Sequence, residues 1–189
     1  MSVCTSPAPY RYVFTGARDH LVRFYDLQSH SSVVGSFVPK LTFEPPHYDS
    51  VQALAFTANF NDRMVTFSGS RDGCLKRWEW DAETMQSVGD VRCHVLSNAH
   101  RAGITSMTVV PWLVESDYQD QLLVSTGRDG ALRIWNAAPE VPLAPLCEVA
   151  AAHSQPINCV AGANTDNGLF VYTASQDRHV RIWRLTTRD

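Results

Sequence analysis

The segment STGRDGALRIWN, residues 125–136, decides the fold predicted for this chain. The run Leu132-Arg133-Ile134-Trp135 indicates a short strand, in which the first and third side chains face one side and the second and fourth face the other. The pair Asp129-Gly130 favours the left-handed backbone of a two-residue hairpin turn. The segment therefore predicts a tight turn that joins two antiparallel strands.

The same pattern recurs four times along the 189 residues. In each copy a Ser or Thr precedes an Asp by four positions, and an aromatic residue follows the Asp by six. Three copies also have an upstream His, which the first copy lacks. Successive Asp residues are 53, 57 and 48 positions apart, which suits a four-stranded repeat with loop insertions. The repeated residues are Thr15, Asp19 and Tyr25; His47, Ser68, Asp72 and Trp78; His100, Ser125, Asp129 and Trp135; and His153, Thr173, Asp177 and Trp183.

Although His, Ser and Asp are typical of hydrolytic enzymes, a catalytic centre normally needs one copy of them. Their recurrence in every unit predicts a structural tetrad in which the Asp accepts from the His ring and the hydroxyl links His to the indole N–H. A fully satisfied buried network of this kind stabilises strand order, whereas an incomplete one is costly. We therefore expect a weaker first unit, no catalytic residues and no cofactor. An enzyme built on one copy is the alternative.

No window of the chain shows an amphipathic helix, so the predicted class is all-β. The segments 15–26, 68–79, 125–136 and 173–184 resemble the WD-repeat propellers, in which each repeat contributes four strands to one blade. Tyr25 replaces the usual Trp in the first copy. The resemblance implies a partial propeller of about three and a half blades, the C-terminal half of a ring of about seven. The expected divisions are a flexible segment at 1–12 and blades at about 13–40, 41–92, 93–150 and 151–189.

An Arg precedes the turn Asp in three of the four copies, and another Arg follows His100. In the WD-repeat family this turn lies on the face where partners most often dock. An arc of guanidinium groups suits an acidic or phosphorylated peptide. The alternative is that these side chains only solvate exposed turns and pair with nearby acids. The residues predicted to bind a partner are Arg18, Arg71, Arg101, Arg128 and Gln176.

A closer resemblance begins at FEPPHYD, residues 43–49, and continues through SQPIN at 154–158 and DRHVRIW at 177–183. These segments look like the C-terminal WD-repeat domain of kinesin-4 motors. The resemblance implies a non-enzymatic scaffold that engages cargo, tubulin or microtubules. The chain has no phosphate-binding Gly-x-x-x-x-Gly-Lys-Ser/Thr motif. A general WD-repeat adaptor, such as a substrate receptor of a ubiquitin ligase, is the alternative, although Trp80-Asp81 is not followed by the Arg associated with many such receptors.

Composition narrows the range of partners. The formal net charge is −3, and 44% of the residues are apolar, so neither nucleic acid nor membrane insertion is expected. The five Cys residues show no Cys-x-x-Cys spacing, and their odd number argues against a disulfide framework. Cys93-His94 is too isolated to indicate a metal site. We expect a cytoplasmic protein with cytoskeletal partners. The open ends of a half-propeller also predict self-association, and further repeats are expected upstream.

Overall fold

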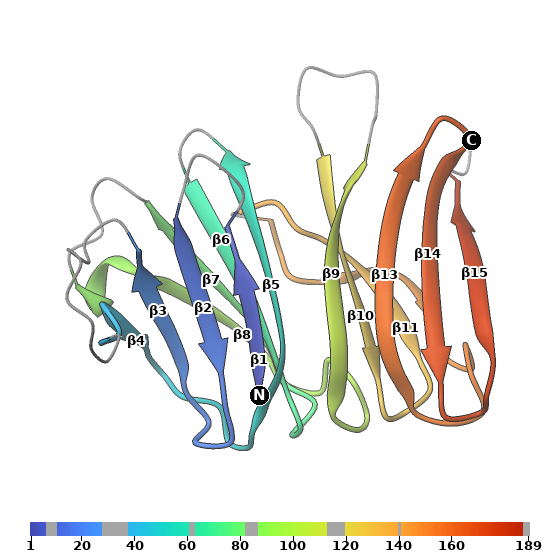
Figure 1. Ribbon diagram of the computed structural model, residues 1–189, viewed down its shortest axis with the longest axis horizontal. Helices are drawn as coiled ribbons and strands as arrows, with labels where there is room; N and C mark the ends of the chain where they lie inside the picture. Colours follow the sequence, from blue (N-terminus) through green and yellow to red (C-terminus); the bar gives the residue numbers. More distant parts are fainter. Residues whose placement is uncertain are drawn as a thin grey trace.

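The computed structural model describes residues 1–6, 11–27, 38–60, 63–81, 87–112, 120–139 and 141–186. Within them the chain forms four antiparallel sheets that stand side by side, as the resemblance implied (Figure 1). The first two sheets contain β1 (Ser2–Thr5), β2 (Tyr12–Gly16), β3 (Val22–Asp26) and β4 (Leu41–Phe43), then β5 (Val51–Phe60), β6 (Arg63–Ser70), β7 (Leu75–Asp81) and β8 (Arg92–Leu96). The other two contain β9 (Ile104–Trp112), β10 (Asp120–Gly127), β11 (Leu132–Asn136) and β12 (Pro145–Val149), then β13 (Ile157–Thr165), β14 (Gly168–Ser175) and β15 (Val180–Leu185).

The expectation of an all-β partial propeller is confirmed. Strands follow one another in chain order within every sheet, as expected for hairpin-connected repeats. The described residues contain one short 3-10 helix, η1 (Val88–Asp90). No helix among them has the length and apolar character needed to cross a membrane.

The N-terminal segment differs from the expected flexible stretch at 1–12. Residues 2–5 form β1, which pairs antiparallel with β2 and places Cys4 opposite Phe14. Cys4 packs against the apolar cluster around Phe14, and burial raises the pKa of its thiol to about 12. The first sheet therefore has four strands rather than about three, because pairing with β2 gives a short, irregular sequence its order.

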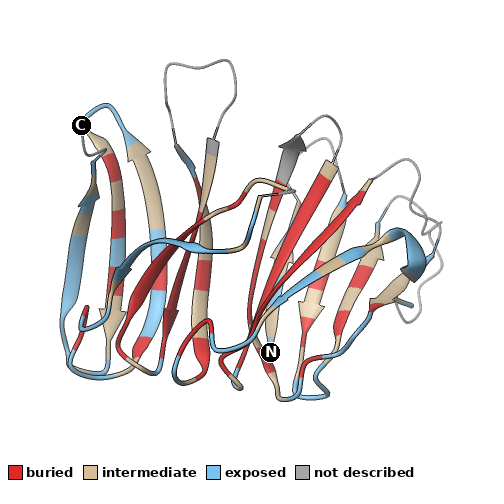
Figure 2. Cartoon of the chain, turned by 180° about the vertical axis from the view of Figure 1, so that it is seen from behind, coloured by how far each residue is buried: buried red, intermediate tan, exposed pale blue. Residues whose placement is uncertain are grey.

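The apolar core lies in the seams between neighbouring sheets. The first seam is aromatic: Phe43 of β4 lies 5.2 Å, centroid to centroid, from Trp78 of β7, and Phe14 and Phe24 pack beside them. The second and third seams are mainly aliphatic. Figure 2 shows buried residues along the strands of the middle sheets, while β15 is mostly exposed at the outer edge. The fourth sheet has three strands in the described residues, so β15 has an unpaired edge there.

Each His-bearing loop is fixed to the turn of the preceding sheet by a backbone hydrogen bond. The N–H of His100 donates to the carbonyl oxygen of Gly73 at 3.1 Å, and the N–H of His153 donates to that of Gly130 at 3.0 Å. The residue after the turn Asp has a left-handed backbone in all four copies, with φ between 68° and 81°. The four residues with this backbone are His20, Gly73, Gly130 and Arg178. The repeated turn thus holds the next loop in place and determines where the candidate site residues lie.

Candidate functional site

The third copy contains a continuous tetrad. Nε1 of Trp135 donates to Oγ of Ser125 at 2.9 Å, and that oxygen lies 2.8 Å from Nε2 of His100. Nδ1 of His100 lies 3.0 Å from Oδ1 of Asp129. When Nδ1 donates to the carboxylate, the Ser125 hydroxyl donates to Nε2, so every link has one donor and one acceptor. Arg133 adds a contact from Nη1 to Oδ2 of Asp129 at 3.0 Å.

This environment keeps Asp129 ionised. Burial alone would raise the pKa of its carboxyl group, but the interactions with His100 and Arg133 outweigh that effect and hold the pKa well below 3.8. An ionised carboxylate is the stronger acceptor for both neighbours. The tetrad is therefore a satisfied, buried polar network that braces the third sheet.

The fourth copy repeats the arrangement with Thr in place of Ser. Nε1 of Trp183 donates to Oγ1 of Thr173 at 2.9 Å, and Nε2 of His153 lies 2.7 Å from the same oxygen. Nδ1 of His153 lies 2.8 Å from Oδ2 of Asp177. Despite the opposing effect of burial, the hydrogen bonds from His153 and from two backbone N–H groups hold the pKa of Asp177 below its ordinary value.

In the second copy, hydrogen bonds join only three of the four tetrad residues. Nε1 of Trp78 donates to Oγ of Ser68 at 2.8 Å, and Nε2 of His47 also lies 2.8 Å from that oxygen. Nδ1 of His47 is buried but has no hydrogen-bond partner. The carboxylate of Asp72 instead accepts from the backbone N–H groups of Cys74 and Tyr48, at 2.7 and 3.1 Å.

The first copy is the least connected. Oδ2 of Asp19 forms an ion pair with Nη2 of Arg23, and both side chains are partly exposed to solvent. Among the described residues no hydrogen bond joins Thr15 to Tyr25, and both line an apolar depression with Val13 and Leu27 on the outer face of the first sheet. The weaker first blade stays a prediction from the sequence, which unfolding measurements can test.

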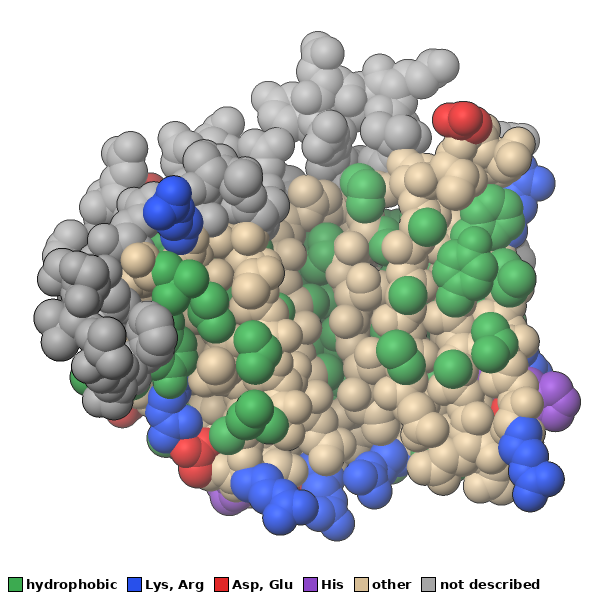
Figure 3. Space-filling model, in the orientation of Figure 1, with side chains coloured by type: hydrophobic (Ala, Val, Ile, Leu, Met, Phe, Trp, Pro, Cys, Tyr) green, Lys and Arg blue, Asp and Glu red, His purple; other side chains and the backbone are tan. Residues whose placement is uncertain are grey.

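The residues predicted to bind a partner lie along one rim. Figure 3 shows Lys and Arg side chains along the lower edge of the molecule, at the strand ends where Figure 1 places these turns. The side chain of Arg71 is 58% exposed, with its Nε 3.9 Å from a carboxylate oxygen of Asp49. The backbone N–H of Arg128 donates to the carbonyl oxygen of Gly103 at 2.9 Å, which holds this turn in place. All five predicted residues are exposed: Arg18, Arg71, Arg101, Arg128 and Gln176.

Two features carry no recognisable sequence motif. Arg77 stands at a position where the other three copies have an apolar residue. It is 1% exposed, with its Nε 2.7 Å from Oε1 of Glu79. Its Nη1 donates to the carbonyl oxygens of Ala138 and Val141, at 3.1 and 2.7 Å. Arg77 thereby ties the second sheet to the connection between β11 and β12. Polarity in an apolar pattern was the only signal for it.

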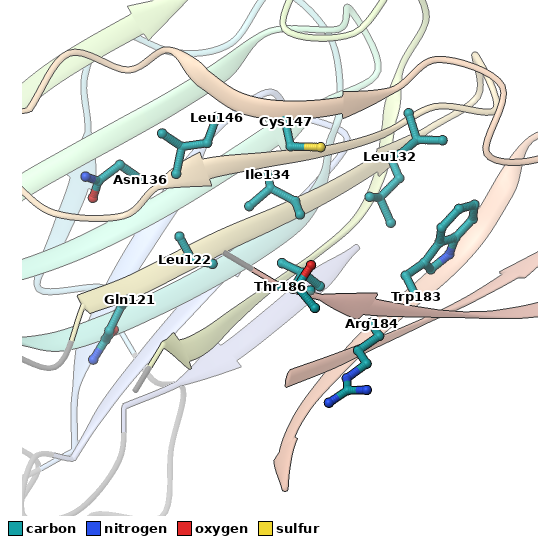
Figure 4. A pocket seen from close by; sticks show the side chains of 12 residues that line it. Gln121, Leu122, Leu132, Ile134, Asn136, Leu146, Cys147, Trp183, Arg184 and Thr186 are labelled. Atoms are coloured by element: carbon teal, nitrogen blue, oxygen red, sulfur yellow. The ribbon is translucent and has the colours of Figure 1, made fainter. Parts of the chain in front are cut away.

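The second feature is a groove of about 470 Å³ between the third and fourth sheets (Figure 4). Leu132 and Ile134 of β11 line one side, and Trp183 and Leu185 of β15 line the other. These strands are far apart in the sequence, so no local pattern marks the groove. It adjoins β15, which has no second strand partner in the described part of the chain.

Comparison with known proteins agrees with this architecture. Residues 91–136 and 146–184 match the family described as WD domain, G-beta repeat. The chain is 28% identical to the human kinesin-like protein KIF21B over 183 residues, which cover 97% of the chain and 9% of that protein. It is 31% identical to the human kinesin-like protein KIF21A over 173 residues, 91% of the chain and 8% of that protein.

A third relative is the kinesin-like protein klp-12 of Caenorhabditis elegans, 28% identical over 177 residues. The resemblance to WD-repeat proteins and to kinesin-like proteins is therefore confirmed at modest identity. The chain spans less than a tenth of the length of these relatives.

Proposed function

We propose that this chain is a non-enzymatic protein-docking domain and acts as the tail module of a kinesin-4-like motor that engages tubulin or a cargo adaptor. The exposed arginines on one rim are the observation that carries the proposal. Their turns are held by backbone hydrogen bonds, so the cationic groups project from a fixed frame. A fixed frame lowers the entropy lost on binding, which favours recognition of a partner.

The proposed partner presents an acidic extended segment to this rim. Guanidinium groups bind carboxylates through paired N–H donors, and an arc of them matches several carboxylates in sequence. Arg71 has only a 3.9 Å contact with Asp49, which leaves its donors available. The net charge of −3 makes the attraction local to the rim rather than a property of the whole domain.

The test is binding of the 189-residue chain to a fluorescent acidic peptide and to tubulin at several salt concentrations. Changing Arg71 and Arg128 together to Glu should leave the far-UV circular dichroism unchanged and abolish binding. Arg184→Glu is the matched control, since this exposed Arg lies at the far end of β15 from the turn. Equal affinity of the double variant and the wild type would refute the use of this rim.

The alternative is a general adaptor, including a substrate receptor of a ubiquitin ligase. Parallel pulldowns with tubulin and with ligase adaptor subunits separate the two functions. Retention of ligase adaptors without tubulin would favour this alternative.

We further propose that the isolated chain self-associates through its open ends. Tyr172, Val180 and Ile182 expose apolar surface on the fourth sheet, over which Figure 3 shows a hydrophobic patch. Val13 and Tyr25 contribute to an apolar depression on the first sheet. A second copy that packs one end against the other would bury both surfaces, as the seams within the chain do.

A further inference from the structure

The second copy differs from the others at its turn carboxylate. Asp19, Asp129 and Asp177 each form an ion pair or charge-assisted contact with a basic side chain. Asp72 has no such partner among the described residues. It accepts hydrogen bonds from two backbone N–H groups, and each oxygen keeps a further lone pair.

Two differences leave Asp72 without a basic partner in the part of the chain that the structure describes. Its His47 does not contact the carboxylate, whereas His153 contacts Asp177 in the fourth copy, where Arg181 also donates to a backbone carbonyl oxygen. The basic side chain that follows Asp72 by four positions also points elsewhere. In the third copy, Nη1 of Arg133 lies 3.0 Å from Oδ2 of Asp129 and 2.7 Å from Nδ1 of His100. In the second copy, Lys76 takes the equivalent position but donates to the carbonyl oxygens of Pro45 and Pro46, at 2.7 and 2.8 Å. Within the described part of the chain, no Lys or Arg side chain therefore bridges the carboxylate of Asp72 and the imidazole of His47.

A third donor atom lies at this place. Cys74 follows Asp72 by two positions, where the other copies have Leu21, Ala131 and His179. One ligand atom from each of His47, Asp72 and Cys74 lies within 4.8 Å of the other two. Nε2 of His47 is engaged by Ser68, so the buried and unpartnered Nδ1 is the ring atom available to the cluster.

We propose that His47, Asp72 and Cys74 form a zinc-binding site at the turn of the second sheet. Nitrogen, sulfur and carboxylate oxygen are the donors that Zn²⁺ takes in proteins, and three of them leave a fourth position for water. Ligand atoms around a tetrahedral zinc ion lie about 3.5 Å apart, so zinc binding would draw these side chains closer together wherever they now lie farther apart than that. This proposal departs from the sequence expectation that the chain has no metal site.

The protonation states suit this role with one cost. Burial and the charge of Lys76 lower the pKa of His47 to about 4, so its imidazole is neutral near pH 7. In the tautomer that carries its proton on Nε2, this atom donates to Oγ of Ser68, which leaves the lone pair of Nδ1 for a metal ion and supplies the outer-shell partner common to ligating histidines. Burial raises the pKa of the Cys74 thiol to about 11, so zinc binding must release the thiol proton to solvent. Lys76 also opposes a second cation nearby, which limits the affinity.

Co²⁺ is the probe for the test, because a bound thiolate gives it a characteristic charge-transfer absorption. The exposed Cys147 and Cys159 are changed to Ser in every protein tested, to remove adventitious thiol ligands. We expect a thiolate band that saturates at one equivalent of Co²⁺ and is displaced by Zn²⁺. Zinc should also raise the thermal unfolding temperature of this protein.

Cys74→Ala supplies the residue that the third copy already has and should lose both the band and the zinc-dependent shift in unfolding temperature. Cys93→Ser is the control, because Cys93 is the other thiol near Lys76 but is not one of the three proposed ligands. This variant should keep the thiolate band. Adding Ala131→Cys to the Cys74→Ala protein should not restore it, because Nδ1 of His100 is engaged by Asp129. Absence of the band before Cys74 is changed, or its persistence in Cys74→Ala, would overturn the proposal. Circular dichroism of each variant separates loss of metal from loss of fold.

Discussion

The carbonyl oxygen of Gly73 accepts the backbone N–H of His100 at 3.1 Å, and a Cβ atom on Gly73 would lie 2.4 Å from the carbonyl oxygen of His100. One turn residue thus holds the loop of the next sheet and leaves no room for its own side chain. Gly130 and His153 repeat this relationship between the third and fourth sheets. Contact between sheets therefore depends on a backbone position that local turn chemistry already favours.

Gly73→Ala should destabilise the fold by at least about 1–2 kcal/mol, the cost of a left-handed backbone for a residue with a Cβ, and the clash with His100 adds to this. Urea unfolding followed by tryptophan fluorescence measures the change. His20→Gly is the converse variant, because His20 has φ of 71° in the first turn. It should leave stability unchanged or raise it slightly. Equal stability of Gly73→Ala and wild type would show that the loop moves to accommodate the methyl group.

Arg77→Met should lower the free energy of unfolding by about 3–5 kcal/mol, the usual cost of removing one member of a buried ion pair. The change deprives Glu79 of its guanidinium neighbour and the carbonyl groups of Ala138 and Val141 of their donor. The double variant Arg77→Met with Glu79→Met should recover part of the loss, which a double-mutant cycle measures. A loss no larger than that of a surface substitution would contradict the proposed tie between the sheets.

Asp129→Asn should weaken the fold at neutral pH and flatten its acid unfolding curve. Because the pKa of Asp129 is lowered in the folded chain, its contribution is fully present above pH 3.8 and is lost as pH falls further. Circular dichroism during an acid titration of wild type and variant tests this. Asp166→Asn, in an exposed turn, is the control. The idea fails if both variants follow the wild-type curve.

Val180→Lys together with Ile182→Lys should reduce self-association of the isolated chain. These side chains are 70% and 63% exposed on β15, and two ammonium groups there would be costly to bury against a second copy. Sedimentation velocity over a range of concentrations measures the change. Val95→Lys, on the outer strand of the second sheet, is the control and should still associate. A wild-type chain that sediments as a 21.1 kDa monomer at every concentration would remove the basis for this prediction.

Much of the architecture could be predicted because its signals are local and repeated. The alternation in 132–135 indicates a strand, and Asp-Gly pairs indicate turns without knowledge of any other part of the chain. Strand β1 was missed because Ser2–Thr5 has little pattern of its own and becomes ordered by pairing with β2. The groove could not be predicted either, because its lining residues come from β11 and β15, which are far apart in the sequence.

The sequence by itself determined the repeated strands, the turns and the exposed arginines beside them, because these follow from residue type and short spacing. Only the tertiary structure decided which polar groups meet. Lys76 and Arg133 occupy equivalent places in their repeats, yet Lys76 reaches carbonyl groups brought by a loop while Arg133 reaches a carboxylate. That difference depends on how neighbouring sheets pack, since packing places groups from distant parts of the chain within hydrogen-bonding distance.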